Sequence, residues 1–499
     1  MIPLMVAFPL LFGFIIVILD TLRARGILIK ASFVLGAVLP AGVFLVENGR
    51  EIVGGWSRVA GIEVGIGEIN APFIVGELIL FTVVALYSLS YFDFRDKKAA
   101  KALVLFLLMH SGLLGAFLAG DFFNFYIYME IASVSAFALV AFSEEPSSKK
   151  AAFKYLILSL LASYLFIFAI GLIYMETGYL NVELVAQNAL PSRELNAALG
   201  VAFASLLLKA GVFPLHGWLP EAHSKAPTPV SALLSGLVVK APAYGMILLF
   251  SALPAGGGLK TAAMMVAVAS IFFGIVMALL QKDAKRLLAY HTVSQMGYVL
   301  LGIATFNFIG AAYYALAHSL FKGGLFLSVG SLGTRSRRLG EFGYKNAPLM
   351  ASSVLMLSLA IGGVSPFIGS YAKGLISSGL EGWLKWAVAG GSIGTLVSFT
   401  KLNYHLWKGE TEDLRASWKL SSLVLALTTL GAGLYLGAGI KPSDIVYIAA
   451  AVFVFFGLRA LDIFEMMVGS EAKDVGREIN VLAAVFVTFI LTVLLLQWP

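Results

Sequence analysis

The sequence contains no cysteine in 499 residues. This absence excludes disulfide bonds, thiolate nucleophiles, cysteine-ligated iron–sulfur clusters and cysteine-type zinc sites on this chain. Charged residues are scarce, at 13% against about 25% in soluble proteins, so a soluble multidomain protein would lack polar surface. Phosphate-loop, nucleophile-elbow and zinc-protease motifs are also absent. We therefore expect no catalytic residue, metal or cofactor on this chain, and no nucleic-acid partner.

Long hydrophobic runs dominate the sequence instead. Hydrophobic residues make up 59% of the chain and the mean hydropathy is +0.90. Because a membrane-spanning helix needs about 20 apolar residues, these runs predict an all-α polytopic membrane protein with about 14–16 transmembrane helices. The predicted spans lie near residues 2–19, 26–46, 71–92, 99–119, 121–143, 151–175, 194–223, 228–252, 261–281, 286–305, 307–332, 348–380, 383–407, 417–437, 443–465 and 478–497.

Basic residues fall mainly in every second loop. Since inner loops of membrane proteins collect lysine and arginine, this alternation predicts a cell-membrane protein whose N-terminus faces the outer side. Among the predicted inner-loop residues are Arg23, Arg25, Arg95, Lys97, Lys98, Lys149, Lys150, Lys282, Lys285, Arg337 and Lys408. The polar, glycine-rich loop at 47–70 is expected to form a small external cap or hairpin.

Two sets of five spans suggest an internal repeat. Residues 99–252 and 261–407 each hold five predicted helices, and an odd number of crossings makes the second set inverted relative to the first. The fourth helix of each set is interrupted, at Leu208–Pro220 and at Gly362–Lys373. Paired broken helices in inverted repeats point to an ion path, whereas a single proline kink would not. The chain then divides into 1–98, repeat one at 99–252, repeat two at 261–407, and 408–499.

Ionisable residues occur deep inside several predicted spans. A charge at mid-bilayer costs several kcal/mol, so such residues face a protein interior or water and usually serve a function. They are Glu130, Lys209, Lys240, His318, Lys322 and Lys373. A carboxylate near Lys209 would favour its charged form, and separation of the two would release the proton towards Lys240. We predict a proton relay; the alternative is a set of static pairs that fix helix packing.

Other polar residues carry weaker signals. Glu77 is a lone carboxylate in a span, and His110 suits a packing role. His216, Glu221 and His223 lack a convincing third ligand for zinc, so His223, together with His291, is expected to serve proton uptake at the inner surface. Asp121 is placed to cap the helix that follows it.

Several long motifs carry a family resemblance over about residues 70–410. They are AGDFFNFYIYMEIASVSAFALVAF, LKAGVFPLHGWLPEAHSKAPTPVSALLSGLVVKAPAYG, HTVSQMGYVLLGIA, AHSLFKGGLFLSVGSL and SPFIGSYAKG. They resemble the antiporter-like subunits shared by respiratory complex I, multi-subunit Na+/H+ antiporters (the D-type subunit), and archaeal membrane-bound hydrogenases and sulfane reductases. The resemblance implies fourteen core helices in two inverted repeats. It also implies roles for Glu130 as the fifth-helix glutamate and for Lys209 and Lys240 as relay lysines.

The same resemblance implies that His318 and Lys322 form the eleventh-helix relay pair and that Lys373 is the terminal proton site. The chain departs from the pattern by about two extra helices after the core and by the absence of a long lateral arm. Its motifs most resemble those of a hydrogenase or sulfane reductase subunit, which implies partner subunits, with Fe–S and Ni–Fe centres on those partners, and transport of H+, either alone or in exchange for Na+. A multi-subunit Na+/H+ antiporter driven only by ion gradients is the alternative.

Overall fold

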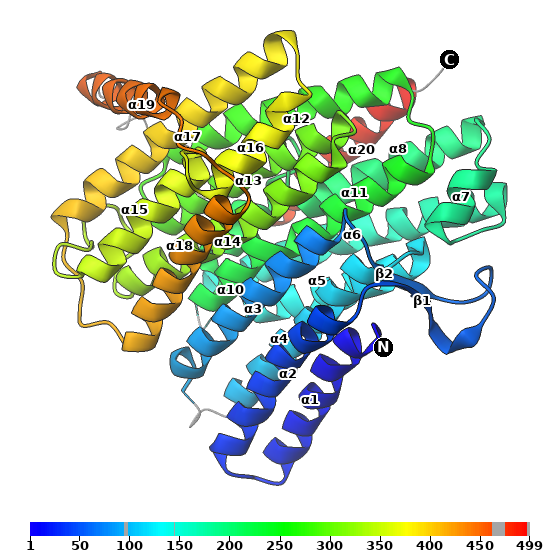
Figure 1. Cartoon of the computed structure of the whole chain (residues 1–499), viewed down its shortest axis with the longest axis horizontal. Helices are drawn as coiled ribbons and strands as arrows, with labels where there is room; N and C mark the ends of the chain where they lie inside the picture. The colour runs from blue at the N-terminus through cyan, green and yellow to red at the C-terminus, as the bar shows by residue number, and fades with distance from the viewer. Residues whose placement is uncertain (94–97, 144, 462–474, 497–499) are drawn as a thin grey trace.

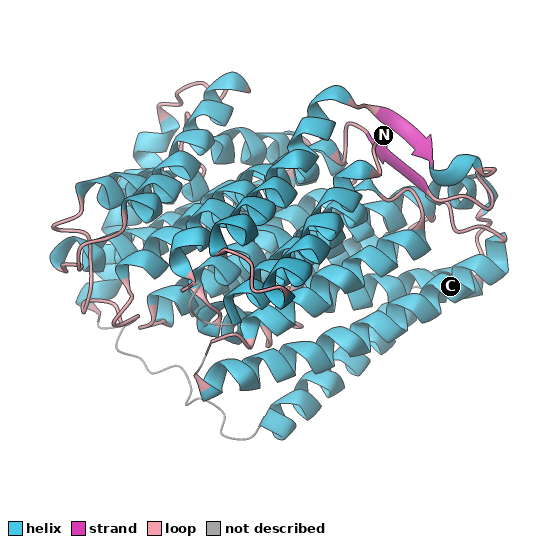
Figure 2. Ribbon diagram, turned by 90° about the horizontal axis from the view of Figure 1, so that it is seen from below, coloured by secondary structure: helices cyan, strands magenta, loops and turns pink. Residues whose placement is uncertain are grey.

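The computed structural model describes residues 1–93, 98–143, 145–461 and 475–496. Its helices run side by side in one large bundle (Figures 1 and 2). Within the described residues, eleven helices are long and apolar enough to cross a membrane. The predicted all-α, multi-pass membrane fold is confirmed. The inner-loop residues Arg95 and Lys97, and residues 462–465 and 497 of the last two predicted spans, lie outside the described residues.

The N-terminal part contains four long helices and a hairpin. Its elements are α1 (Leu4–Thr21), α2 (Gly26–Val46), β1 (Gly49–Ile52), the short η1 (Val53–Gly55), β2 (Glu63–Ile66), α3 (Ala71–Tyr91) and α4 (Lys98–Leu118). The strands pair antiparallel, with Gly49 opposite Ile66, and glycines at positive φ, including Gly54 at 76°, make the turn possible. The hairpin predicted between residues 47 and 70 is therefore confirmed.

The next segment contains the first interrupted helix. It comprises α5 (Phe122–Val140), α6 (Pro146–Thr177), α7 (Val182–Asn188), α8 (Arg193–Ala210), α9 (Leu219–Lys225), α10 (Thr228–Leu233), the π-helical turn η2 (Leu234–Val238) and α11 (Lys240–Ala252). The Asp121 side chain accepts a hydrogen bond from the Asn124 N–H at 2.6 Å, which confirms its capping role at α5. The helix predicted at 194–223 is split into α8 and α9, because Gly211 adopts φ 65° and ends α8.

The remaining segment repeats this pattern of long helices with one break. It comprises α12 (Gly257–Leu280), α13 (Ala284–Ala304), α14 (Phe308–Leu332), α15 (Pro348–Gly362), α16 (Ile368–Ser378), α17 (Gly382–Lys408), α18 (Ala416–Tyr435), α19 (Ser443–Ala460) and α20 (Val475–Leu496). Gly363, at φ 85°, ends α15 in the way that Gly211 ends α8. Both predicted breaks are thus present, while the inverted relation of the two segments stays a prediction.

The interior is formed by the helices that carry the predicted relay. All residues of the most apolar stretches of α10–α11 and α13 are buried, and nearly all of α14, whereas α1, α2 and α19 are mostly exposed. Exposed apolar helices in such a bundle face lipid or neighbouring subunits. Figure 1 shows α13 and α14 in the middle of the molecule, with α19 at its edge beside α17, which it contacts. The helices that carry Lys240, His318 and Lys322 are therefore shielded from lipid, whereas α5 is half buried.

Candidate functional site: a row of buried lysines

Glu130 and Lys209 form an ion pair inside the bundle. The Lys209 ammonium, on α8, donates to Glu130 Oε1, on α5, at 2.6 Å. The Ser163 hydroxyl donates to the same oxygen at 2.6 Å, and two more hydroxyls, of Ser133 and Ser159, lie 3.2 Å from Lys209 Nζ. The structure thus brings together the carboxylate and the lysine that the sequence placed in separate spans.

Lys240 lies where the π-helical turn η2 meets α11. A π turn frees a backbone carbonyl, and here the carbonyl of Ser235 accepts from the Lys240 ammonium. The carbonyl of Gly236 accepts from Ser319 on α14 at 2.6 Å. A cavity of ≈10 Å³ is lined by Lys209, by Val238, the last residue of this turn, and by Ala241, which follows Lys240. That volume is about the space that one water molecule needs, so a single water fits beside Lys209, next to the segment that carries Lys240.

Lys322 and His318 lie one turn apart on α14. Lys322 donates to the carbonyl of Leu288 on α13 and sits 4.9 Å from the centre of the Phe326 ring. His318 is 0% exposed and interacts electrostatically with both Lys240 and Lys322. His318 therefore lies within electrostatic range of both lysines.

Lys373 lies on α16, just beyond the second break. Its ammonium donates to the carbonyls of Ile361 at 3.1 Å and Gly362 at 2.9 Å, and to the hydroxyl of Ser392 at 3.2 Å. These two carbonyls are among the last four of α15, which have no partner inside their own helix. Lys373 also lines a cavity of ≈390 Å³, so the end of the row is beside open space.

Three buried histidines accompany the lysines. His223, His291 and His318 are each 0% exposed, and neither ring nitrogen of any of them has a hydrogen-bond partner among the described residues. Buried polar groups are nearly always hydrogen-bonded, to protein or to ordered water. Each of these rings can therefore bind an ordered water.

The positions of the histidines connect the row. His291 interacts electrostatically with Lys322 and Lys373, and His223 with Lys240, Lys285 and Lys322. Lys285 lines a second cavity of ≈380 Å³, together with Arg337 of a predicted inner loop. His223 is more deeply buried than its predicted surface role suggested, but it is within reach of a lysine at that cavity. Of the eight predicted site residues, Glu130 and Lys209 are hydrogen-bonded to each other, and the three histidines lie within electrostatic range of the lysines.

Sequence reasoning missed two further buried contacts. Glu77 Oε1 and His110 Nδ1 are 2.5 Å apart between α3 and α4, and both side chains are 0% exposed. His110 also stacks on Phe81, with ring centres 3.9 Å apart. The predicted packing role is therefore correct, but His110 also pairs with Glu77. Lys401, on α17, donates to the carbonyls of Leu279 and Gln281 at 2.6 and 2.8 Å and so stabilises the end of α12.

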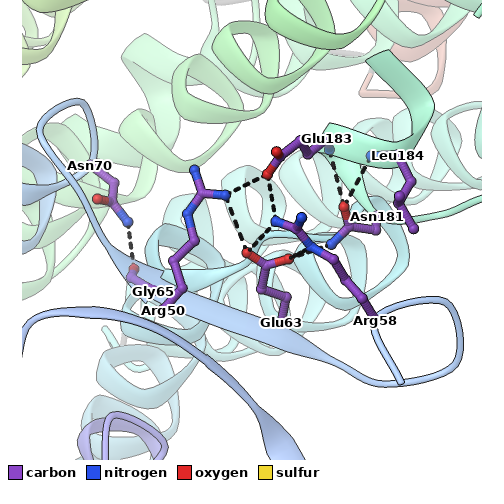
Figure 3. A network of polar contacts seen from close by, with 8 residues as sticks. All are labelled: Arg50, Arg58, Glu63, Gly65, Asn70, Asn181, Glu183 and Leu184. Atoms are coloured by element: carbon purple, nitrogen blue, oxygen red, sulfur yellow. Dashed lines mark hydrogen bonds and ion pairs between the residues drawn. The ribbon is translucent and has the colours of Figure 1, made fainter. Parts of the chain in front are cut away.

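The hairpin is fastened by a separate polar cluster (Figure 3). Arg58 donates to Glu63 at 2.8 Å and to Glu183 at 2.5 Å, and Arg50 donates to Glu183 at 2.7 Å. Asn181 donates to Glu63 at 2.7 Å. Burial raises the pKa of Glu63, but the hydrogen bonds from Arg58 and Asn181 and the two arginine charges outweigh it, so the pKa is lower than usual. The hydrogen bonds from Arg58 and Arg50 lower the pKa of Glu183 as well. The cluster therefore holds both carboxylates ionised and keeps β1 and β2 against α7.

The part of the chain that the structure describes contains no group of three or more His, Cys, Asp and Glu side chains arranged to hold a metal ion. The site is therefore built from amines, imidazoles, hydroxyls and one principal carboxylate, all of which can carry or share protons.

Comparison with known proteins places this chain in a family. Residues 119–400 match the family described as NADH:quinone oxidoreductase/Mrp antiporter, TM. The chain is 35% identical over 371 residues to the N subunit of an NADH-quinone oxidoreductase of Desulforudis audaxviator, covering 70% of this chain and 73% of that protein. It is 29% identical to the D-type subunit of an Na(+)/H(+) antiporter of Alkalihalophilus pseudofirmus, covering 84% and 87%.

Solved structures agree with these matches. A chain of the membrane-bound sulfane sulfur reductase, an archaeal respiratory membrane complex, is 25% identical and superimposes with a TM-score of 0.78 over 91% of this chain and 97% of that one. A chain of the Mrp complex from Dietzia sp. DQ12-45-1b has the same fold, with a TM-score of 0.77 over 92% and 98% at 24% identity. The resemblance seen in the motifs is confirmed: this chain belongs to the NADH:quinone oxidoreductase/Mrp antiporter transmembrane family.

Proposed function

We propose that this chain is the ion-translocating, antiporter-like subunit of a redox-driven membrane complex related to the membrane-bound hydrogenases and sulfane reductases. The observation that carries the proposal is the Glu130–Lys209 pair, at 2.6 Å, which begins a row of buried lysines. Lys240, Lys322 and Lys373 have no carboxylate partner among the described residues; carbonyls accept from all three. A buried amine without a counter-ion passes its proton on more readily than one in an ion pair.

The geometry suggests an order for the proton sites. Protons from the inner side reach the row through the cavity at Lys285 and through His223. They move between Lys209 and Lys240 across the small cavity, then through His318 and Lys322, and then through His291 to Lys373. The ≈390 Å³ cavity next to Lys373 is the outlet on the outer side, with the N-terminus outward. Opening of the Glu130–Lys209 pair releases the first proton and so couples this row to a neighbouring subunit.

Electron transfer takes place on partner subunits in this proposal. The sulfane sulfur reductase chain, which shares 25% identity and nearly its whole length, supports such an assembly. Fe–S and Ni–Fe centres are assigned to the partners, because this chain has no cysteine to ligate them. Membrane and peripheral subunits, lipid and H+ are then the partners of this chain.

A second candidate is a subunit of an Na+/H+ antiporter driven only by ion gradients. It is favoured by the match to the D-type subunit of an Na(+)/H(+) antiporter over 84% of the chain. The neighbouring reading frames distinguish the two candidates. Reading frames for a Ni–Fe-type large subunit or for Fe–S proteins next to this gene indicate the redox complex. A set of small membrane subunits alone indicates the antiporter.

The proposed relay can be tested with matched buried lysines. Lys240→Ala should abolish proton movement in sealed vesicles carrying the assembled complex, since it removes a stepping stone from a dry span. Lys401→Ala is the control, because Lys401 is 3% exposed and also donates to backbone carbonyls, but belongs to no part of the row. Equal proton release by the Lys240→Ala complex and the unmodified complex would refute the relay.

A further inference from the structure

At each helix break, a backbone N–H finds its hydrogen-bond partner on another helix. At the first break, the Phe213 N–H donates to the Ser270 hydroxyl of α12 at 3.1 Å. At the second break, the Ser365 N–H donates to Asp444 Oδ2 of α19 at 2.8 Å. An unpaired N–H at membrane depth is costly, so both partners stabilise the break. Asp444 thus accepts a backbone N–H at the second break, as Ser270 does at the first, but Asp444 carries a negative charge.

Asp444 accepts two hydrogen bonds from the same residue, Ser365. The Ser365 hydroxyl also donates to Asp444 Oδ2, and the same hydroxyl accepts from the Lys441 N–H at 3.0 Å. Asp444 is 7% exposed, although α19 as a whole is mostly exposed. Further along α19, Ala451 and Phe455 belong to a small apolar cluster with Val364. The start of α19 is therefore fastened to the break itself.

The same contacts form a wall of the cavity beside Lys373. That cavity of ≈390 Å³ is lined by Lys373, Lys385 and Lys441 and, as the one carboxylate among its described lining residues, by Asp444. Lys373 satisfies the carbonyls on one side of the break, while Asp444 satisfies the N–H on the other. The two side chains together hold the break open in a fixed shape.

We propose that Asp444 is a positioning residue for proton release, and that α19 acts as the clamp that sets the width of the outlet at Lys373. This inference rests on the proposed function for the role of Lys373, but the clamp itself rests on the contacts of Ser365. Both bonds from Ser365 end on one oxygen, Oδ2, so an asparagine can replace the carboxylate as acceptor through its own carbonyl oxygen. Alanine cannot.

The absence of cysteine makes the outlet measurable. A single cysteine at Ser377, which lines the cavity, reports access through the rate at which a water-soluble thiol reagent modifies this subunit in the intact complex. A cysteine at the exposed neighbour Ser378 is the control. We expect Asp444→Ala to change the labelling rate at position 377 at least fivefold and to lower proton release at least tenfold, with no change at position 378. Asp444→Asn should keep both within about twofold of the unmodified complex.

The possible results separate the clamp from other roles. Unchanged labelling and transport in an assembled Asp444→Ala complex would overturn the proposal. Loss of transport in Asp444→Asn with unchanged labelling would overturn it as well, since the charge and not the position would then matter. If Asp444→Ala does not assemble, Ser365→Ala removes only the hydroxyl contacts and should still shift labelling at 377 by a smaller factor; no shift would refute the clamp. Labelling does not depend on transport, so it decides the clamp even if a Lys373→Leu complex pumps normally.

Discussion

The ion pair at the start of the row offers the sharpest test of the mechanism. In Glu130→Ala, Lys209 loses the oxygen 2.6 Å away that balances its charge and keeps only the hydroxyls of Ser133 and Ser159. In Glu130→Gln, the amide oxygen can still accept from Ser163, but the negative charge is gone. Both variants should therefore lose transport, because the charge and not the hydrogen bond holds the proton on Lys209.

The structure sets the size of the effect. Removing one partner of a buried ion pair destabilises the remaining charge by about 3–5 kcal/mol. The Glu130 side chain is 18% exposed and that of Lys209 is 4% exposed, so solvent reduces the figure to about 2–3 kcal/mol. Since about 1.4 kcal/mol is a factor of ten, the proton affinity of Lys209 should fall about 30- to 150-fold, and transport should fall with it, up to the same factor.

The assay is the initial rate of pH change in sealed vesicles that contain the assembled complex. Ser163→Ala is the matched control, because it removes one neutral hydrogen bond to Glu130 and should lower the rate by no more than about fivefold, the equivalent of about 1 kcal/mol. A Glu130→Ala complex that assembles and pumps within twofold of the unmodified one would refute the gating role of the pair.

Three more predictions follow from other contacts. Lys373→Glu should retain some proton release while Lys373→Leu retains none, because a carboxyl group can also carry a proton. If both variants release protons from sealed vesicles at the normal rate, Lys373 has a structural role only. Glu63 has a lowered pKa, so its contribution to hairpin stability is present above the unfolded value of about 4.3 and is lost as the pH falls through the folded value. Hydrogen exchange at residues 49–66, corrected for intrinsic rates, should accelerate below about pH 4, stay constant from 6 to 8, and show a weaker pH dependence in Glu63→Gln, in which Glu183 still titrates. Glu77→Ala should destabilise the protein by about 2–4 kcal/mol, seen as earlier thermal unfolding, with transport kept in the assembled complex; loss of transport at normal stability would contradict a structural pair.

The sequence was sufficient to predict the positions of the membrane-spanning helices, of the two breaks and of the buried ionisable residues. Long apolar runs leave few alternatives to transmembrane helices, and an ionisable residue inside such a run is conspicuous because it is costly. Gly211 and Gly363 could be recognised as breaks because a glycine and a proline lie together there. The observed helices and breaks are close to the predicted ones wherever the local amino-acid composition determines the structure.

Contacts between residues that are far apart in the sequence could not be predicted in this way. Glu77 and His110 are 33 positions apart, and Ser365 and Asp444 are 79 apart, so no helical period relates them. Asp444 follows a proline at the start of a helix, where an acidic residue is ordinary. The π turn before Lys240 has no composition signal either, because its stability comes from Ser319 of α14, which binds a carbonyl within the turn. Such residues become visible only when neighbouring helices are placed.

The two breaks also differ in a way that bears on the direction of transport. At the first break, the carbonyl of Leu208 accepts from the Trp218 indole at 2.8 Å, a donor that never loses its proton under physiological conditions. At the second break, the corresponding carbonyls accept from the Lys373 ammonium, which keeps two of its three N–H donors when it releases its proton. Only the second break therefore changes its hydrogen bonding with each proton that passes. A release step that frees a backbone carbonyl for water suits an outlet, because that water can take up the proton, and this supports placing the outlet at Lys373.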